Sequence, residues 1–375
     1  MQIAVNAIFL QKTSLEGYGW FVQEVFKRLV IQHPEHEFIF VFDRPYNESF
    51  VFAKNVTPVV VKPAARHIFS FKYWYDLKAP MALKKFQPAI WVQPYGFCSL
   101  TTKTPQLMVV HDLAFLHYPK FISWHQRWYY QRFTPKFLKK AKQIVTVSEF
   151  SKQDILLHYP VEANKLSVVH GAAREGFDPL DWGSKDATKA SYADGREYFL
   201  FVGGVHPRKN LMNLLKAFSL FKKWQHSNMK LLVVGRLAWQ YGDIVEKLKT
   251  YKYREDVVML NYVSEQTLTQ LTASAYALVY PSFFEGFGLP ILEAMQSGVP
   301  VITSNTSSMP EIAGEAALFA SPDDPDAIAK QLLLIYKDES AREKLIEAGK
   351  LRAASFSWDD TANKFWEAIL KTVEN

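Results

Sequence analysis

The sequence predicts an α/β protein with two domains, each built on a parallel sheet covered by helices on both faces. Short runs of β-branched and aromatic residues alternate with stretches of helical periodicity, which is typical of parallel strands joined by helices. The alternation occurs twice, and 375 residues are enough for two domains. A polar segment at 175–196, containing Gly, Pro, Asp and Ser, separates the two halves.

In chain order, the first half is expected to hold strands at 2–9, 37–43, 90–93, 106–111 and 143–148, with a helix at 19–32. The second half is expected to hold strands at 198–202, 230–235, 257–260, 277–280, 299–303 and 317–319, with a helix at 211–224.

The last segment is predicted to be one amphipathic helix, because its apolar residues Trp358, Phe365, Trp366 and Leu370 recur at helical spacing. No strand follows it, so we expect it to leave the second domain and pack back on the first; a simple terminal helix is the alternative. The predicted domains are therefore 1–180 and 190–355, with a crossing helix at 356–375.

The bulk composition narrows the class of protein. Hydrophobic and charged contents of 49% and 22% are globular values, and the 15% of aromatic residues suits stacking surfaces, membrane-interface contacts or a well-filled core. Cys98 is the one cysteine, which excludes an intramolecular disulfide and fits a reducing cytoplasm. The N-terminus reads as a first strand, not a signal peptide, and no apolar run reaches the roughly 20 residues that span a bilayer.

Positive charge is concentrated in the first half. Residues 1–180 hold 22 basic and 13 acidic residues, whereas the rest holds 22 and 24. Such a field suits an anionic lipid or acceptor, with nucleic acid as the competing partner. Segment 120–142 mixes aromatic with basic residues, which is typical of an interfacial membrane contact. A helix with an aromatic core face and a solvated basic face stays open as the alternative.

The strongest local pattern is Pro281-Ser-Phe-Phe-Glu285-Gly-Phe-Gly-Leu-Pro290-Ile-Leu-Glu293. A strand leads into a glycine-containing loop, and a helix begins near Pro290, because proline is favoured in a first helical turn. The N–H groups of the loop and the helix N-terminus form an anion site. Glu285 and Glu293 can face one ligand and accept hydrogen bonds from sugar hydroxyls. An ordinary capped helix with a solvated glutamate is the simpler alternative.

A second pattern, Phe201-Val-Gly-Gly204-Val-His-Pro-Arg208-Lys209-Asn210, also lies between a strand and a helix. Adjacent arginine and lysine suit a diphosphate, because arginine offers a planar fork of donors and lysine a point charge. Alone, this pattern also fits a solvated basic turn.

With these two patterns, the chain resembles the retaining glycosyltransferases of the group 1 family (family 4), which have the GT-B fold. Their marker is two glutamates separated by seven residues, the spacing of Glu285 and Glu293. The resemblance extends through Val-Val-His-Asp-Leu at 109–113, Val-Thr-Val-Ser-Glu-Phe-Ser-Lys at 145–152 and Val-Val-His-Gly at 168–171, and so covers nearly the whole chain. It implies two Rossmann-like, doubly wound domains facing across a cleft, the first on the acceptor side and the second binding the nucleotide sugar.

The resemblance also implies the roles of single residues. Arg208 and Lys209 would bind the donor diphosphate and stabilise the leaving group. Glu285 would contact the sugar near the reacting carbon, and Glu293 would hold the ribose hydroxyls. His111 would lie across the cleft near the sugar, in a positioning or electrostatic role.

The resemblance implies further positions in the donor site. Gly17 and Gly19 would form a close turn near the phosphates, and Gly235 and Arg236 would line the nucleotide pocket. Tyr262 and Val263 would flank the base, and the main-chain amides of Phe287, Gly288 and Leu289 would meet the sugar or phosphates.

The expected activity is that of a retaining hexosyltransferase acting in cell-surface polysaccharide synthesis. The resemblance implies a nucleotide-diphosphate sugar as donor, with GDP-mannose favoured by similarity to mannosyltransferases and a UDP-sugar as the alternative. The expected acceptor is a glycan or a lipid-linked acceptor. The enzyme is expected in the cytoplasm, with peripheral attachment to the inner face of an anionic membrane as the further option. A sugar-nucleotide hydrolase or epimerase on the same fold is the alternative enzyme. A basic nucleic-acid-binding protein is disfavoured, because it leaves the two-glutamate loop unexplained.

No cofactor beyond the nucleotide sugar and no metal is expected. The acidic run Asp323, Asp324 and Asp326 precedes a helical stretch, and capping of that helix explains it. His111, His117 and His125 share no metal-ligand spacing.

Overall fold

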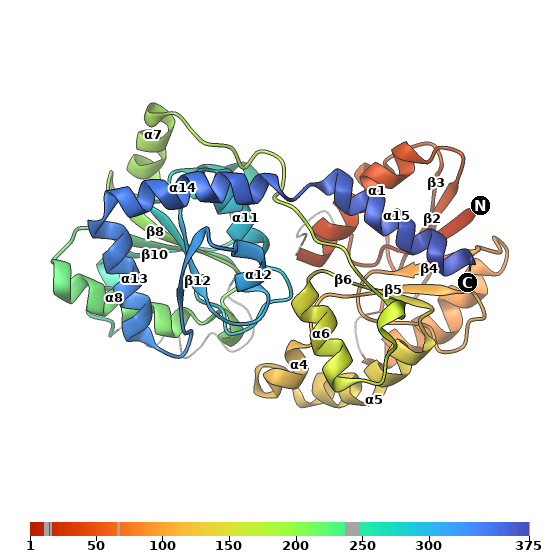
Figure 1. Cartoon of the computed structure of the whole chain (residues 1–375). Coiled ribbons are helices and arrows are strands. Elements are labelled where there is room, and N and C mark those ends of the chain that lie inside the picture. The colour runs from red at the N-terminus through yellow and green to blue at the C-terminus, as the bar shows by residue number, and fades with distance from the viewer. Residues whose placement is uncertain (11–14, 16, 66–67, 237–247, 249, 375) are drawn as a thin grey trace. The chain divides into compact units, whose positions relative to one another are not determined.

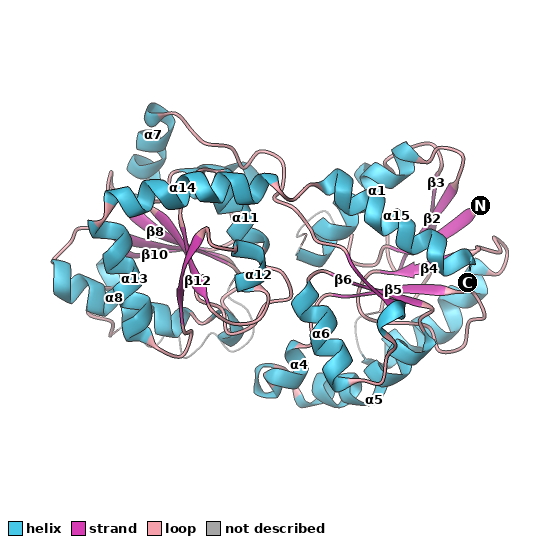
Figure 2. Ribbon diagram, viewed as in Figure 1, coloured by secondary structure: helices cyan, strands magenta, loops and turns pink. Residues whose placement is uncertain are grey.

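The computed structural model describes the chain except for residues 11–14, 16, 66–67, 237–247, 249 and 375. It divides into two compact units: Met1–Gly171 together with Ser357–Asn375, and Ala172–Phe356. Each unit is a parallel sheet with helices packed on it, which confirms the predicted fold class (Figure 2).

The first unit holds a seven-stranded sheet in the order β3-β2-β1-β4-β5-β6-β7, and every neighbouring pair is parallel. Its strands are β1 (Gln2–Asn6), β2 (Glu37–Phe42), β3 (Val56–Val60), β4 (Ile90–Gln93), β5 (Gln106–Val110), β6 (Gln143–Thr146) and β7 (Leu166–Val168).

The second unit holds a six-stranded parallel sheet in the order β10-β9-β8-β11-β12-β13. Its strands are β8 (Tyr198–Val202), β9 (Lys230–Val234), β10 (Val257–Leu260), β11 (Ala277–Tyr280), β12 (Val301–Ser304) and β13 (Ala317–Ala320).

Helices cover both sheets in the described parts of the chain (Figure 1). In the first unit they are α1 (Gly17–Gln32), α2 (Ile68–Tyr73), α3 (Ala79–Leu83), α4 (Ala114–His117), α5 (Trp124–Lys140), α6 (Glu149–His158) and α15 (Trp358–Glu374), with a π-helical turn at Trp74–Lys78 between α2 and α3. In the second unit they are α7 (Trp182–Ala193), α8 (Leu211–Gln225), α10 (Glu265–Ala273), α11 (Leu289–Gln296), α12 (Met309–Ala313), α13 (Pro325–Lys337) and α14 (Glu339–Ala354).

Two strands that the sequence pattern did not predict, β3 and β7, lie at the two edges of the first sheet. Strand β3 contains Pro58, which has no N–H to donate and is tolerated at an edge, where one side of the strand pairs with nothing in the sheet. Strand β7 has three residues, too few to show a period. The buried central strands, by contrast, were predicted to within about three residues.

The terminal helix α15 packs on the first unit, against α1. Its Phe365 and Trp358 make edge contacts with Phe21, at ring-centroid distances of 6.0 and 6.3 Å. At the rim of this contact Arg28 Nε lies 2.8 Å from Asp359 Oδ1. The apolar stripe of α15 is therefore buried within the unit that begins the chain, and the chain crosses between the units twice.

Helix α5 divides its aromatic residues between core and solvent. Tyr129 and Phe137 are buried in an apolar cluster with Leu138, whereas Trp124 and Trp128 are 71% and 53% exposed. The helix begins after Ser123, whose hydroxyl accepts from the Gln126 N–H in a capping box. Among the described residues, no helix combines the length and apolar composition needed to cross a membrane.

Candidate functional site

The predicted Arg-Lys and two-glutamate loops both leave the carboxyl edge of the second sheet. They follow β8 and β11, which are neighbours at the centre of the sheet. The chain continues from β8 to β9 on one side and from β11 to β12 on the other, so the strand order reverses between them. In open parallel sheets this reversal point is where ligands bind, because the two loops diverge there and leave room.

The loop after β8 is held in place by one amide side chain. Residues Pro207–Lys209 form a 3₁₀ turn that ends at Asn210, which adopts a left-handed conformation. Asn210 is buried, and its Nδ2 donates to the carbonyls of Pro281 and Pro322 at 2.9 and 2.7 Å. The loops that follow β8, β11 and β13 are thereby tied together, and Arg208 and Lys209 are positioned as a pair.

Arg208, Lys209 and Glu285 form a direct ion cluster. Lys209 Nζ lies 2.8 Å from Glu285 Oε1, and Arg208 Nη1 lies 3.0 Å from Glu285 Oε2. Lys209 also donates to the hydroxyl of buried Tyr280 and stands over its ring. The carboxylate is 8% exposed, whereas the Arg208 and Lys209 side chains are 22% and 17% exposed. The cluster therefore presents more cation than anion to solvent.

The Glu285 carboxylate is held in its ionised form. Burial acts to raise its pKa, but the charges of Arg208 and Lys209, with hydrogen bonds from Lys209 and Ser282, outweigh burial and lower the pKa to about 2. A carboxyl group with this pKa is not a proton donor near neutral pH. It can orient cations and accept hydrogen bonds from hydroxyl groups.

The loop of Glu285 is braced by two serines that the sequence patterns did not identify. The N–H of Glu285 donates to Ser307 Oγ at 3.0 Å. Ser308 Oγ donates to the carbonyls of Glu285 and Phe287, at 2.8 and 3.0 Å. Gly288 then turns with φ of +104°, which favours glycine, and α11 begins at Leu289 with proline in its first turn. The N–H groups at the start of α11 thus face the carboxyl edge of the sheet.

Glu293 is paired with an arginine that the sequence analysis did not select. Arg174 Nε lies 2.6 Å from Glu293 Oε1, and both residues are buried. Arg174 stacks on the Phe177 ring, and its Nη1 lies 3.5 Å from the more exposed Glu265. Arg174 was missed because it lies in an irregular segment near the predicted linker, more than a hundred residues from its partner.

A third loop meets the Gly203–Gly204 turn from the neighbouring strand β9. Gly235 has a φ of +152°, and a Cβ built on it would lie 2.0 Å from the carbonyl oxygen of Gly203. Any side chain here would push the loops of β8 and β9 apart. The next residue, Arg236, stands 5.2 Å from the centre of the Tyr262 ring, which is 60% exposed. Partly buried Val263 follows it. Together Arg236 and Tyr262 form an open platform suited to stacking.

The remaining predicted residues belong to the first unit. His111 follows β5 and contacts the rings of Tyr18 and Phe21 of α1, at centroid distances of 4.7 and 5.5 Å. Gly17 begins α1 and is exposed. Gly19 is buried, and a Cβ on it would lie 2.7 Å from Leu15 Cδ2 and 3.3 Å from the Phe9 carbonyl. Gly19 thus lets α1 pack closely on the loop after β1.

His111 is a neutral imidazole over the physiological range. Burial lowers its pKa to about 4, although the hydrogen bond to the Pro94 carbonyl and the charge of Asp112 act to raise it. Its Nε2 lies 3.0 Å from the Pro94 oxygen, which can only accept, so Nε2 carries the proton.

This shift predicts a pH-dependent loss of stability. Because the folded pKa of about 4 lies below the ordinary 6.5, the unfolded chain binds a proton that the folded chain does not, and stability falls as pH drops from about 6.5 towards 4. At pH 5, protonation of His111 in the unfolded chain lowers the free energy of unfolding by an amount on the order of 1–2 kcal/mol. Chemical denaturation at several pH values should show a shallower pH slope for His111→Gln than for wild type. The control His125→Gln, at an exposed position, should keep the wild-type slope, and equal slopes for all three proteins would contradict the prediction.

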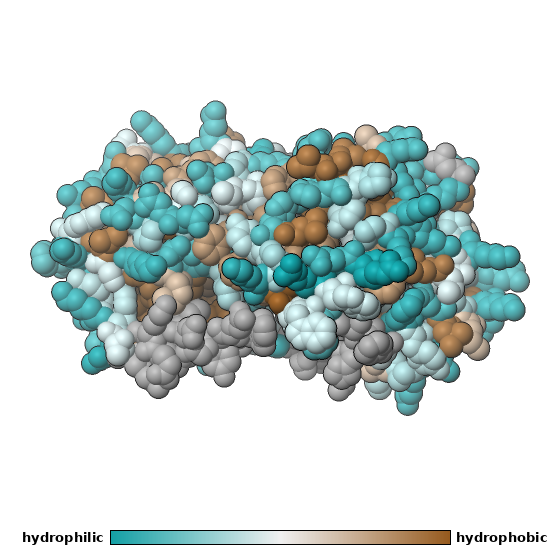
Figure 3. Space-filling view, turned by 90° about the horizontal axis from the view of Figure 1, so that it is seen from below, coloured by the Kyte–Doolittle hydropathy of each residue, from teal (hydrophilic) through white to brown (hydrophobic). Residues whose placement is uncertain are grey.

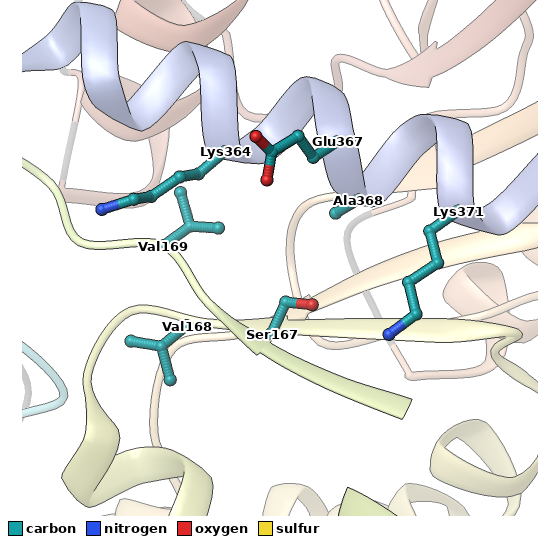
Figure 4. A pocket seen from close by; sticks show the side chains of 7 residues that line it. All are labelled: Ser167, Val168, Val169, Lys364, Glu367, Ala368 and Lys371. Atoms are coloured by element: carbon teal, nitrogen blue, oxygen red, sulfur yellow. The ribbon is translucent and has the colours of Figure 1, made fainter. Parts of the chain in front are cut away.

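A groove elsewhere in the first unit carries none of the predicted residues. It lies between β7 and α15 (Figure 4), where Lys371 donates to the Asn164 carbonyl and Lys364 pairs with Asp360. Its lining is Ser167, Val168, Val169, Lys364, Glu367, Ala368 and Lys371. Its two lysines already contact protein oxygens, so we do not regard it as the functional site.

Comparison with known proteins gives matches over both units. Residues 17–173 match the family model described as Glycosyltransferase Family 4, and residues 184–352 match that of Glycosyl transferases group 1. The O-antigen chain mannosyltransferase B of Escherichia coli is 30% identical over 361 residues, which cover 93% of this chain and 94% of that protein. The O-antigen chain mannosyltransferase RfbU of Salmonella typhimurium is 32% identical over 222 residues, 58% and 57% of the two chains.

Solved structures are similar over the whole chain. Anabaena HepE in complex with UDP and glucose has a TM-score of 0.79 at 13% identity, covering 99% of both chains. WaaG, a glycosyltransferase involved in lipopolysaccharide biosynthesis, has a TM-score of 0.77 at 14% identity, covering 98% of this chain and 99% of that one. Likeness at such identities concerns the fold, and it confirms the predicted GT-B fold.

Proposed function

This chain belongs to the group 1 glycosyltransferases of family 4, and we propose that it transfers mannose from GDP-mannose to a glycan or lipid-linked acceptor in cell-surface polysaccharide synthesis. The single observation that supports this best is the Arg208–Lys209–Glu285 cluster at the strand reversal point of the second unit. Mannose and the polysaccharide setting are inferred from the O-antigen mannosyltransferases to which the chain is similar.

The cluster suits the departure of a nucleoside diphosphate. Breaking the bond between the anomeric carbon and the phosphate builds negative charge on the diphosphate and positive charge on the sugar. Arg208 and Lys209 are already oriented by Glu285 and Tyr280, so they stabilise the diphosphate with little reorganisation. Glu285, ionised and only 8% exposed, is proposed to accept hydrogen bonds from the sugar hydroxyls and to stabilise the positive charge near the anomeric carbon.

The other residues take positions around the donor in this proposal. Glu293 holds the ribose hydroxyls, and Arg174 fixes the rotamer of its carboxylate. The Arg236–Tyr262 platform takes the base. His111, as a neutral imidazole, orients the transferred sugar and is not the base of the reaction. The reaction proceeds with retention of configuration and without a catalytic metal, the phosphate oxygen taking the acceptor proton.

A panel of nucleotide sugars tests the donor assignment. GDP-mannose and GDP should raise the melting temperature of the protein more than UDP-glucose, UDP-galactose or UDP, because a ligand that binds only the folded state stabilises it. Greater stabilisation by the UDP series would replace GDP-mannose with a UDP-sugar. Stabilisation by neither series would contradict the donor site itself.

A hydrolase on the same fold is separated from a transferase by an assay without acceptor. A transferase incubated with donor alone should release nucleoside diphosphate slowly, and the rate should rise when lipid-linked glycan extracted from cells is added. Release at full rate without any acceptor would identify a sugar-nucleotide hydrolase. Conversion of the donor to an isomeric nucleotide sugar would identify an epimerase.

The surface of the first unit supports the proposal that the enzyme works at an anionic membrane. Trp124 and Trp128 lie one turn apart on α5 and are exposed. Tyr73, Leu77 and Met81, spaced by four along the segment from α2 to α3, are 43%, 45% and 61% exposed. These five side chains are the apolar patch.

Basic side chains lie on the two helical segments that carry the apolar patch. Lys72 stands 5.1 Å from the centre of the Phe133 ring, which joins the α2 segment to α5. Exposed Arg127, Arg132 and Lys136 lie on α5 itself. Figure 3 shows one face of the molecule, viewed from below Figure 1, on which hydrophilic and hydrophobic side chains are interspersed. Aromatic residues among cations are typical of interfacial contacts.

Replacing Trp124 and Trp128 together by serine should abolish binding to vesicles that contain phosphatidylglycerol. The cause is loss of the aromatic contact area, while the charges stay. Flotation with phosphatidylcholine vesicles, with and without phosphatidylglycerol, measures this. Trp224→Ser, at an exposed tryptophan on α8, is the matched control and should bind as wild type does. If the double variant floats with the vesicles as the wild type does, the apolar patch is not the membrane-binding surface.

A further inference from the structure

Two imidazoles and a carboxylate meet on helices that the proposed donor chemistry does not use. His117 ends α4, and Asp154 and His158 lie one turn apart on α6 (Figure 1). His117 Nε2 lies 2.9 Å from both carboxylate oxygens of Asp154. His158 Nδ1 lies 3.1 Å from Oδ1 of the same carboxylate. The ligand atoms of all three residues are within 4.8 Å of one another.

We propose that His117, Asp154 and His158 bind one divalent transition-metal ion, with Zn²⁺ as the best-suited ion. Two imidazole nitrogens and one carboxylate oxygen are a common ligand set for zinc with an open position. Bonds of about 2.0–2.1 Å place neighbouring ligand atoms roughly 3.0–3.4 Å apart in octahedral and tetrahedral sites. The nitrogen-to-oxygen separations of 2.9 and 3.1 Å therefore need to change by only a few tenths of an ångström, whereas the two imidazole nitrogens, within 4.8 Å of each other, have to converge on the ion by rotation of the partly exposed side chains.

The surroundings favour a cation and leave it accessible. The Asp154 side chain is 5% exposed, so its negative charge faces little water, whereas His117 and His158 are 31% and 35% exposed. An apolar cluster that contains Phe115 and Ile155 lies beside the three residues. A metal bound here would have apolar side chains of low dielectric on one side and solvent on the other, and water would complete its coordination.

Hydrogen bonding alone is the competing explanation for the cluster. In that case each imidazole donates to Asp154, and His158 Nδ1 also donates to the main-chain carbonyl of Asp154 at 2.9 Å. In the metal-bound form each imidazole carries its proton on the other ring nitrogen, Nδ1 of His117 and Nε2 of His158, and the lone pairs of His117 Nε2 and His158 Nδ1 bind the ion. The two arrangements differ in whether a metal changes the properties of the protein.

The place of the cluster gives the metal a structural role. Helix α4 begins at Ala114, two residues after Asp112, and the Ala114 N–H donates to Asp112 Oδ1 at 3.0 Å. Helix α6 holds the same turn, because Ser151 Oγ donates to the His111 carbonyl at 3.0 Å. An ion that joins His117 to Asp154 and His158 links the two helices flanking His111. It stabilises the first unit and takes no part in the chemistry at Glu285.

Metal titration of untagged, chelator-treated full-length protein tests this proposal. Zn²⁺ should bind with a stoichiometry of one ion per chain by calorimetry and raise the melting temperature. Co²⁺ should give the visible d–d absorption of an imidazole-containing site. His117→Gln and His158→Gln should each weaken Zn²⁺ binding at least about tenfold. His125→Gln, an exposed histidine on α5, is the control and should bind as wild type does.

The outcomes are distinct. Absence of saturable Zn²⁺ binding, or binding of equal strength in wild type and both variants, overturns the proposal. Because His117 and His158 are partly exposed, circular dichroism should show both variants folded. If one variant does not fold, the Co²⁺ absorption of the other variant is compared with that of the wild type. Loss of the wild-type d–d bands supports the metal site, and unchanged bands overturn it. None of these measurements depends on transferase activity. Failure of the metal-site proposal would therefore leave the proposed donor chemistry unaffected, and the reverse also holds.

Discussion

Lys209→Ala is expected to lower kcat/KM for sugar transfer by about 10²–10⁴-fold while the protein stays folded. Lys209 is the cation that contacts Glu285 at 2.8 Å and Tyr280 at the same time, so its charge is fixed before the donor arrives. A preoriented charge stabilises the departing diphosphate in the transition state, and removing one such group commonly costs 10²–10³ in rate. The ground-state contact with the diphosphate adds to the loss.

The fold should tolerate this change, because Arg208 still pairs with Glu285 and the Lys209 side chain is partly exposed. Lys223→Ala, an exposed lysine at the end of α8, is the matched control and should keep wild-type kinetics. Lys209→Arg should recover part of the lost rate, because it restores the charge with a different shape. Wild-type kcat/KM in Lys209→Ala, with an unchanged melting temperature, would remove the residue from the site.

Glu293→Gln is expected to have the second largest effect, on both donor affinity and stability. The change leaves the buried Arg174 guanidinium without its partner at 2.6 Å, and breaking a buried ion pair from one side typically costs about 3–5 kcal/mol. Glu265→Gln is the matched control. It removes a more exposed carboxylate at 3.5 Å from the same guanidinium and should cost less than about 1 kcal/mol.

Donor affinity separates the ribose role of Glu293 from its structural role. GDP should bind the wild type more tightly than 2′,3′-dideoxy-GDP, because the analogue lacks the hydroxyls that Glu293 is proposed to hold. In Glu293→Gln this preference should shrink by about tenfold. If the variant loses stability but keeps the wild-type preference for GDP, Glu293 is a structural partner of Arg174 and does not hold the ribose.

The sequence predicted the parts of the fold that its local patterns specify. Central strands such as 198–202 and 277–280 are buried on both faces, so they read as continuous apolar runs, and the structure has them at the predicted bounds. The edge strands β3 and β7 were not predicted. Pro58 argues against a strand at β3, and β7 has only three residues, too few to show a pattern. The amphipathic helix at the C-terminus could be predicted from its periodicity, whereas its contact with α1 depends on tertiary packing.

For the candidate site, the glycine and charge patterns identified the two loops but not the residues that hold these loops in position. Arg208, Lys209 and Glu285 stand in two recognisable loops, and the fold brings these loops together at adjacent strands. Arg174 and Ser308 carry no local signal, because a single polar residue in an irregular segment has many explanations. His117 shares no ligand spacing with its neighbouring histidines in the sequence. Its partners Asp154 and His158 lie on a helix almost forty residues away, and only the fold brings the three side chains together.

The most direct test of the central claim is amide hydrogen exchange with and without GDP-mannose. We expect slower exchange in the loops 203–210 and 281–289 and at the start of α11, because the donor would contact their N–H groups and exclude water. Exchange in α5, on the first unit, should not change. Protection confined to the first unit, or unchanged exchange in both loops at saturating donor, would contradict a donor site built on Arg208, Lys209 and Glu285.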